Sequence, residues 1–268
     1  AFEREKNNFL SVYPNSNLKT TLSNLSTNFY IESGDTEKAI EALDKSKANT
    51  DDADVKENNT IKIIGLKLEK KDYKDMEKYL GEISDPEERA YYSAQYYAQK
   101  KDPKLVKEYE TLLKSEKYKA YASKALGDYY FDKKDLAKSK KYYGTHVSVN
   151  KNPDEYVLYR LGQANEKENN LKMALADYKL VYEKKGKLAE DAMLRAAEIY
   201  DRQENNVEAE KLFTKLYATK GNKDLKAYSI EKLIYYKLLN EKTKEAKKYY
   251  DELKKLDAKR AEKFKAYF

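Results

Sequence analysis

The sequence contains a single histidine, His146, and no cysteine among its 268 residues. A histidine metal site needs further ligands, and a catalytic histidine needs a partner side chain that orients it. Without cysteine, thiolate nucleophiles, thiolate metal sites and disulfides are excluded. His146 follows Tyr142 by four residues on the inward face of an expected helix, so we interpret it as a packed structural residue.

The acidic residues form short clusters that do not match a metal-binding loop. Asp51, Asp52 and Asp54 lack the glycine and glutamate of a calcium loop, so we interpret them as a linker with a helix cap. Glu87 and Glu88 suit the first turn of a helix, where the helix dipole favours negative charge. Phosphate-binding glycine loops, dinucleotide fingerprints and metalloprotease helix motifs are absent. We therefore predict no catalytic, cofactor or metal site and no enzymatic activity.

Tyrosine, whose ring carries a polar hydroxyl, is abundant: the chain has 27 tyrosines, and several stand in adjacent pairs. Neighbouring residues on a helix point about 100° apart, so one ring of a pair fills a helix seam while the other faces elsewhere. Two interpretations stay open: both rings of each pair are packing residues, or one of them contributes to a ligand surface.

The elements that position these residues come from a repeat. A short turn followed by a helix start recurs about every 34 residues, a period typical of stacked helical hairpins that bind partners. The recurring turns begin at Gly34, Lys71, Lys101, Lys134, Asn169, Glu204 and Glu241. Around Lys134 the apolar spacing predicts one helix over 119–132 and a second over 136–145. Strand signals are almost absent.

Charge and hydrophobicity limit the classes of protein to which the chain can belong. Leu, Ile, Val and Phe are scarce, but the tyrosines and the helical period of the apolar residues indicate a folded chain. No apolar run approaches the roughly 18 residues of a membrane span. The net charge is +7, yet residues 1–57 are acidic on balance and residues 237–268 are basic. The charges are either solvated helix faces or a basic tail that meets an acidic partner or a lipid surface.

The hairpins resemble tetratricopeptide repeats (TPRs). That family has a small residue in helix A, an aromatic residue three positions later and an alanine in helix B. The small residues are Ala94, Gly127, Gly162 and Ala197; the aromatics are Tyr97, Tyr130 and Tyr200; the alanines are Ala39, Ala174, Ala209 and Ala246. Asn165 replaces the aromatic in one hairpin, and Ile64 and Ile234 replace the small residue in two others. The resemblance implies an all-α, right-handed superhelical solenoid of about seven hairpins with unpaired terminal helices.

The expected boundaries describe one solenoid over residues 1–268. Its hairpins are expected at about 16–50, 54–84, 86–117, 118–150, 153–186, 188–221 and 223–256. Residues 1–13 resemble a helix B and residues 257–268 a helix A, so we expect a fragment of a longer array whose open ends favour self-association. Residues 9–16 resemble repeat junctions of bacterial periplasmic TPR proteins of envelope assembly. A periplasmic or envelope location is therefore expected, with the cytoplasm as the alternative.

The resemblance also implies which helix-A residues line a concave groove that grips an extended partner. These candidates are Tyr91, Gln95, Tyr121, Lys124, Asp128, Tyr156, Tyr159, Gln163, Tyr228, Glu231 and Tyr235. Tyrosine is a rigid contact residue that is enriched at binding hot spots. We therefore predict a non-catalytic scaffold that binds a protein or peptide.

Two alternatives remain: an RNA-binding helical-repeat protein, which acidic residues such as Asp128 and Glu231 oppose, and a regulatory repeat segment of a larger enzyme.

Overall fold

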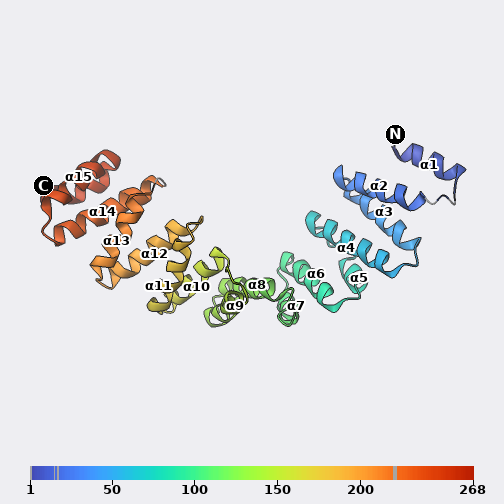
Figure 1. Cartoon of the computed structure of the whole chain (residues 1–268), viewed down its shortest axis with the longest axis horizontal. Coiled ribbons are helices and arrows are strands. Elements are labelled where there is room, and N and C mark those ends of the chain that lie inside the picture. Colours follow the sequence, from blue (N-terminus) through green and yellow to red (C-terminus); the bar gives the residue numbers. More distant parts are fainter. Residues whose placement is uncertain (1, 15, 17, 220–221) are drawn as a thin grey trace. The chain divides into compact units, whose positions relative to one another are not determined.

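The computed structural model describes residues 2–14, 16, 18–219 and 222–268 and is helical, with no strand in that part of the chain. The predicted hairpin 188–221 therefore ends in residues that lie outside the described ones. Figure 1 shows the helices in chain order. They are α1 (Phe2–Val12), α2 (Lys19–Glu32), α3 (Thr36–Ala48), α4 (Ala53–Lys70), α5 (Met76–Gly81), α6 (Pro86–Gln99), α7 (Leu105–Leu112), α8 (Lys119–Asp132), α9 (Leu136–Val149), α10 (Glu155–Lys167), α11 (Leu171–Glu183), α12 (Ala189–Arg202), α13 (Asn206–Tyr217), α14 (Lys223–Leu239), α15 (Thr243–Leu256), α16 (Ala258–Ala261) and a 3₁₀ helix, η1 (Glu262–Tyr267).

The chain forms two compact units, unit 1 over residues 1–122 and unit 2 over residues 123–268, and the division falls inside α8. In unit 1, α2 packs against α3, α3 against α4, and α6 against α7. In unit 2, α10 packs against α11, α12 against α13, and α14 against α15, while α11 and α13 also contact the following helix A (Figure 1). The all-α helical-hairpin fold predicted from the sequence is confirmed.

Each recurring turn has the same backbone conformation. The first residue of every predicted turn is left-handed, with φ between 55° and 74°, and only Gly34 among them is a glycine. The next residue donates its N–H to a carbonyl five residues earlier at 2.8–2.9 Å, as in Asp135 to Tyr130. This is the six-to-one bond of a Schellman motif, which ends helix A and reverses the chain. Asp35, Asp135 and Asn205 then cap helix B by accepting a backbone N–H three residues later.

Small residues in helix A allow an aromatic of helix B to lie against the backbone. A Cβ built on Gly127 would be 2.4 Å from ring atoms of Tyr143, and one on Gly162 would be 2.8 Å from Tyr178. Ser139, at the alanine position, donates its hydroxyl to the carbonyl of Gly127 at 3.0 Å. The hydroxyls of these two buried tyrosines remain partnered, because Tyr143 donates to Asp128 at 2.6 Å and Tyr178 to Glu166 at 2.8 Å.

The core of unit 2 repeats this arrangement along the chain. Tyr178, Phe213 and Tyr236 are fully buried among leucines and alanines of α10 to α14. Ile234 replaces the small residue of the seventh hairpin, and it is buried with Ala246, Tyr250 and Leu253. The isoleucine is thus accommodated without loss of the hairpin. In unit 1 the corresponding Ile64 is buried with Leu43, Ile63 and Met76.

The segment 257–268 differs from the predicted helix A. Only Ala258–Ala261 is α-helical, and Glu262–Tyr267 forms a 3₁₀ helix. Ala261 is buried and Phe264 packs against the same cluster of α14 and α15 residues. These two apolar residues are three apart, and a helix of three residues per turn places such residues on one side.

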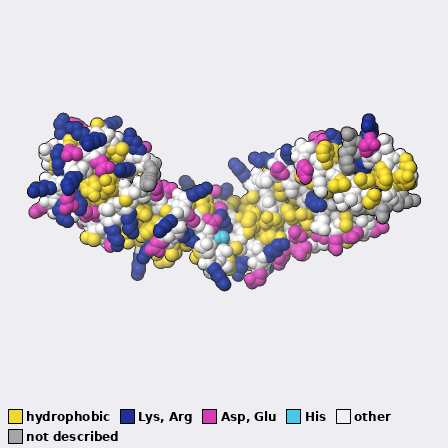
Figure 2. Space-filling view, turned by 45° about the horizontal axis from the view of Figure 1, so that its top comes forward, with side chains coloured by type: hydrophobic (Ala, Val, Ile, Leu, Met, Phe, Trp, Pro, Cys, Tyr) yellow, Lys and Arg dark blue, Asp and Glu magenta, His cyan; other side chains and the backbone are white. Residues whose placement is uncertain are grey.

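Figure 2 shows Lys and Arg side chains gathered over the C-terminal helices, as the basic composition of residues 237–268 predicts. At the other end of the chain hydrophobic side chains are exposed over α1 and α2, including Val12, Leu25 and Phe29. No helix within the described residues is both long and apolar enough to cross a membrane.

Candidate partner-binding surface

In unit 1 the structure brings two predicted groove tyrosines together. Tyr91 on α6 stacks on Tyr118 with ring centres 4.8 Å apart, and its ring lies 5.3 Å from that of Tyr121 on α8. Tyr121 also meets the edge of Tyr109 at 5.8 Å and remains 38% exposed. These rings form an aromatic patch that is partly open to solvent. Gln95, one turn after Tyr91, is half-buried and has no side-chain hydrogen bond within the described residues.

In unit 2, Lys124 on α8 and Tyr156 on α10 lie side by side. The Lys124 ammonium is 5.2 Å from the centre of the Tyr156 ring and 2.5 Å from Oδ2 of Asp154, which caps α10. Asp128 lies one turn after Lys124 and accepts a hydrogen bond from the Tyr143 hydroxyl. Burial raises the pKa of Tyr156, and the charge of Asp128 adds to this effect while Arg160 opposes it. The predicted residues Lys124, Asp128 and Tyr156 therefore share one site.

Arg160 is a central residue of this site that the sequence interpretation missed. Its guanidinium carbon lies 4.4 Å from the centre of the Phe131 ring and 5.1 Å from that of Tyr156. Its Nε donates to the Tyr156 hydroxyl at 2.8 Å. The ammonium of Lys167 lies 4.6 Å from the Phe131 ring. We call Lys124, Phe131, Tyr156, Arg160 and Lys167 the cation–aromatic cluster.

A sequence signal for Arg160 does exist. Basic residues recur at one helix-A position of three successive hairpins, at Arg160, Arg195 and Lys232, each one residue after a groove candidate or its equivalent. In the other two hairpins the cation is paired with a carboxylate. Arg195 lies 3.8 Å from Glu198, and Lys232 lies 2.5 Å from Asp201. The position is thus positively charged in all three hairpins, but within the described residues only Arg195 and Lys232 form an ion pair with a carboxylate there.

The remaining candidates of α10 are partly packed. Tyr159 lies 5.7 Å from the ring of Tyr178 and borders the core of unit 2. Gln163 is half-buried, and its side chain makes no hydrogen bond within the described part of unit 2. Tyr159 therefore supports the hairpin as well as the surface.

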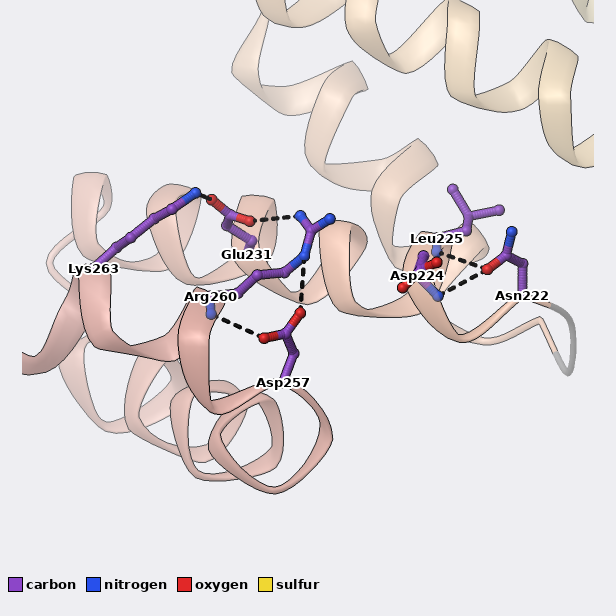
Figure 3. Close-up of polar contacts among 7 residues, drawn as sticks. All are labelled: Asn222, Asp224, Leu225, Glu231, Asp257, Arg260 and Lys263. Atoms are coloured by element: carbon purple, nitrogen blue, oxygen red, sulfur yellow. Dashed lines mark hydrogen bonds and ion pairs between the residues drawn. The ribbon is translucent and has the colours of Figure 1, made fainter.

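The three candidates on α14 have different surroundings. Tyr228 meets the edge of Phe213 at 5.8 Å, and Tyr235 is 50% exposed. Glu231 accepts hydrogen bonds from Arg260 Nη1 at 3.0 Å and Lys263 Nζ at 2.5 Å (Figure 3). Asp257 orients Arg260 by accepting its backbone N–H at 3.0 Å and its Nε at 3.2 Å. The carboxylate of Glu231 is thus engaged by the chain's own C-terminal turns.

The residues considered for catalysis or metal binding have structural surroundings. His146 is buried on α9, and Asp52 caps α4 by accepting the N–H groups of Asp54 and Val55. Within the described residues no three His, Asp or Glu side chains are grouped as metal ligands would be.

No family model and no curated protein matches the sequence, whereas solved structures match the fold. The C-terminal part of a TPR repeat-containing protein from Cytophaga hutchinsonii is 20% identical, with a TM-score of 0.66 over 88% of this chain and 96% of that one. A structure of MamA is 16% identical, with a TM-score of 0.50 over 67% of this chain and 96% of that one. The tetratricopeptide-repeat fold expected from the sequence is confirmed.

Proposed function

We propose that this chain is a non-catalytic scaffold whose helix-A faces bind an extended segment of a partner protein. The observation that carries the proposal is the partly exposed aromatic and cationic side chains at the predicted groove positions of α6, α8, α10 and α14. Proteins with this fold commonly act as interaction surfaces, which agrees with the surface chemistry. Partner identity is left to experiment.

Tyrosine and arginine suit such a role because each offers a large contact area together with a polar group. Tyr121 and Tyr235 keep exposed rings, while neighbouring aromatic contacts restrict their side chains before a partner arrives. Immobilising a flexible side chain on binding costs about 0.5–1.5 kcal/mol. Rings that are already packed avoid part of this cost, which supports a surface built for recognition.

Affinity capture from a lysate of the source organism tests the proposal. The bait is the 268-residue chain, compared with the variant Tyr121→Ala/Tyr156→Ala/Tyr159→Ala after circular dichroism has shown that both are helical. We expect a protein that the wild type enriches and the triple variant loses. The control Tyr13→Ala/Tyr267→Ala removes two exposed tyrosines outside the predicted groove and should retain the partner. Equal enrichment by all three baits would contradict the proposal.

RNA binding is the alternative that the cation–aromatic cluster itself favours, since bases stack on aromatic rings and phosphates meet cations. The carboxylates of Asp128 and Asp154 lie in the same site and oppose a polyanion. Recovery of RNA in the capture, with an affinity that falls steeply with salt concentration, would favour this alternative. Light scattering on the bait separates partner binding from self-association through the exposed ends.

An envelope location is proposed on the sequence of residues 9–16 alone, and fractionation of the source cells tests it. Detection of the protein only in the cytoplasmic fraction would contradict the proposal.

A further inference from the structure

The side of α15 that faces solvent is strongly basic. Ala246 and Leu253, on its other side, are fully buried with residues of α14. Because an α-helix turns by about 100° per residue, the solvent-facing side is made by Lys244, Lys247, Lys248, Asp251, Lys254 and Lys255. All of them are exposed except Lys247, which is half-buried. We call these six residues the lysine face, and Figure 2 shows Lys and Arg side chains gathered over this end of the chain.

Most of the positive charge on the lysine face is not neutralised. Lys247 lies 3.1 Å from Asp251, which is the one carboxylate on the face. The other four lysines make no ion pair with any described residue. The lysine face therefore presents an excess of positive charge to solvent.

The glutamates of α15 lie away from the lysine face. Glu245 is 2.8 Å from Lys237, and Glu252 is 3.0 Å from Lys226. Both of these lysines belong to α14, so the two carboxylates are held at the neighbouring helix and do not reach the lysine face. Opposite charges are thus separated onto different sides of α15.

Aromatic rings border the lysine face. The ring of Phe268 lies 4.9 Å from that of Tyr250 and 5.4 Å from the ammonium of Lys247. Phe268 remains 37% exposed, and the side chain of Tyr267 is 62% exposed. Exposed aromatic rings beside lysines suit the surface of a membrane, because the rings enter the boundary between headgroups and acyl chains while the cations meet anionic lipid.

The repeat by itself does not account for the lysine face. The helix B of the preceding hairpin is α13, and it lies 37 residues earlier when Ala209 is aligned with Ala246. Its equivalent positions have one lysine, Lys211, which lies 3.4 Å from Glu208. The other five equivalents are Val207, Glu210, Thr214, Tyr217 and Ala218. The concentration of unpaired lysines is therefore a property of α15 and not of helix B in general.

We propose that the lysine face binds the surface of an anionic lipid bilayer, with the rings of Tyr267 and Phe268 among the polar headgroups. The lysines extend over about 16 Å of one helix, which matches an extended charged surface better than a small ligand. Their attractions to anionic lipid add together and act within a Debye length of the membrane. The lysine face belongs to a helix B, whereas the predicted partner surface belongs to the helices A, so the two surfaces are separate.

Vesicle co-sedimentation of the full 268-residue chain tests the proposal. We expect the wild type to bind vesicles of equimolar phosphatidylcholine and phosphatidylglycerol, less tightly as salt concentration rises, and not to bind pure phosphatidylcholine. The variant Lys244→Gln/Lys248→Gln/Lys255→Gln should bind the anionic vesicles about tenfold or more weakly, because three attractions are lost together. The control Lys62→Gln/Lys70→Gln/Lys107→Gln removes the same charge from exposed lysines of unit 1 and should bind as the wild type does.

The variant Tyr267→Ser/Phe268→Ser keeps every charge and should bind the anionic vesicles several-fold more weakly, since the rings no longer enter the headgroup region. Circular dichroism and thermal melting check that each variant folds as the wild type does. Unchanged affinity in this variant would overturn the assignment of the rings to the membrane.

Failure of the wild type to bind the anionic vesicles would overturn the proposal, as would equal binding to both kinds of vesicle. Equal losses in the two lysine variants would also overturn it, because net charge alone would then explain the binding. Binding of labelled hexaglutamate or oligothymidylate that depends on the lysine face, without binding of vesicles, would reject the membrane and point to an acidic protein or a nucleic acid.

Discussion

The ring of Tyr143 lies directly against the backbone of Gly127, so closely that any side chain at residue 127 would collide with it. The two residues belong to helix A and helix B of one hairpin, and Tyr178 with Gly162 repeats the contact 35 residues later. This contact brings the two helices together and aims the tyrosine hydroxyl at Asp128. The spacing of a glycine and a tyrosine thus determines both the packing and the hydrogen bond.

Gly127→Ala is expected to destabilise unit 2 by about 1–3 kcal/mol, the usual cost of overpacking a close contact. Its Cβ would lie 2.4 Å from two ring atoms of Tyr143, a side chain that is fully buried. Chemical denaturation measures the change. Gly144→Ala in α9 is the matched control, because a Cβ there meets no atom within 4 Å and alanine stabilises a helix interior by about 0.5–1 kcal/mol. Destabilisation by both variants would show that the contact is not the cause.

Lys134→Gly is expected to stabilise the fourth hairpin, by roughly 0.5–1 kcal/mol after the entropic cost of glycine in the unfolded chain. Lys134 has φ of 62°, a left-handed conformation that costs energy for a residue with a Cβ. Thermal denaturation of the variant measures the effect. Lys133→Gly changes the neighbouring residue, which is not left-handed, and should not stabilise the protein. A gain from both substitutions would contradict the argument from backbone strain.

Asp177 is expected to make the protein less stable as pH rises. Burial raises the pKa of Asp177 to about 6, although Asn165 donates to its carboxylate at 2.7 Å. Because the folded pKa exceeds that of the unfolded chain, its contribution is full below about pH 4 and is lost as pH rises through about 6. Asp177→Asn cannot ionise and should remove this loss.

The measurement for Asp177 is the free energy of unfolding at pH 4.5 and pH 7 for the wild type and Asp177→Asn. We expect the variant to gain stability relative to the wild type on going from pH 4.5 to pH 7. Asp251→Asn serves as control, since that carboxylate is 54% exposed in its pair with Lys247. A constant difference between wild type and Asp177→Asn at both pH values would contradict the buried-carboxylate explanation.

Glu231→Gln is expected to loosen the C-terminal turns. Glu231 is the common acceptor of Arg260 and Lys263, so its neutralisation weakens two charge-assisted hydrogen bonds at once. Hydrogen exchange should accelerate several-fold over residues 258–267, which corresponds to about 1 kcal/mol of local opening free energy. Glu262→Gln breaks only an exposed pair with Lys265 and should leave exchange unchanged. Unaltered exchange in Glu231→Gln would mean that the apolar contacts of Ala261 and Phe264 hold the segment alone.

The sequence by itself determined the hairpins. The recurring turns begin at seven of the nine left-handed residues in the described part of the chain, the other two being Asp75 and Lys185. The spacing of apolar residues predicted α8 to the residue and the start of α9. These features are local, because a Schellman turn and an amphipathic helix depend on residues within a few positions of one another. The predicted helix over 257–268 was wrong for most of its length, since contacts with α14 and α15 accompany a 3₁₀ geometry there.

The tertiary structure decided which charged side chains form ion pairs with residues of another helix. Arg195 has a local partner, Glu198, where Arg160 has Gln163, but nothing local distinguishes Glu231 from the other acidic groove candidate, Asp128. Between hairpins, Phe131 of α8 lies against the Arg160 guanidinium of α10, and Glu231 receives two cations from 29 and 32 residues away. Ion pairs between helices depend on distances that are set by how the hairpins pack rather than by their order in the sequence.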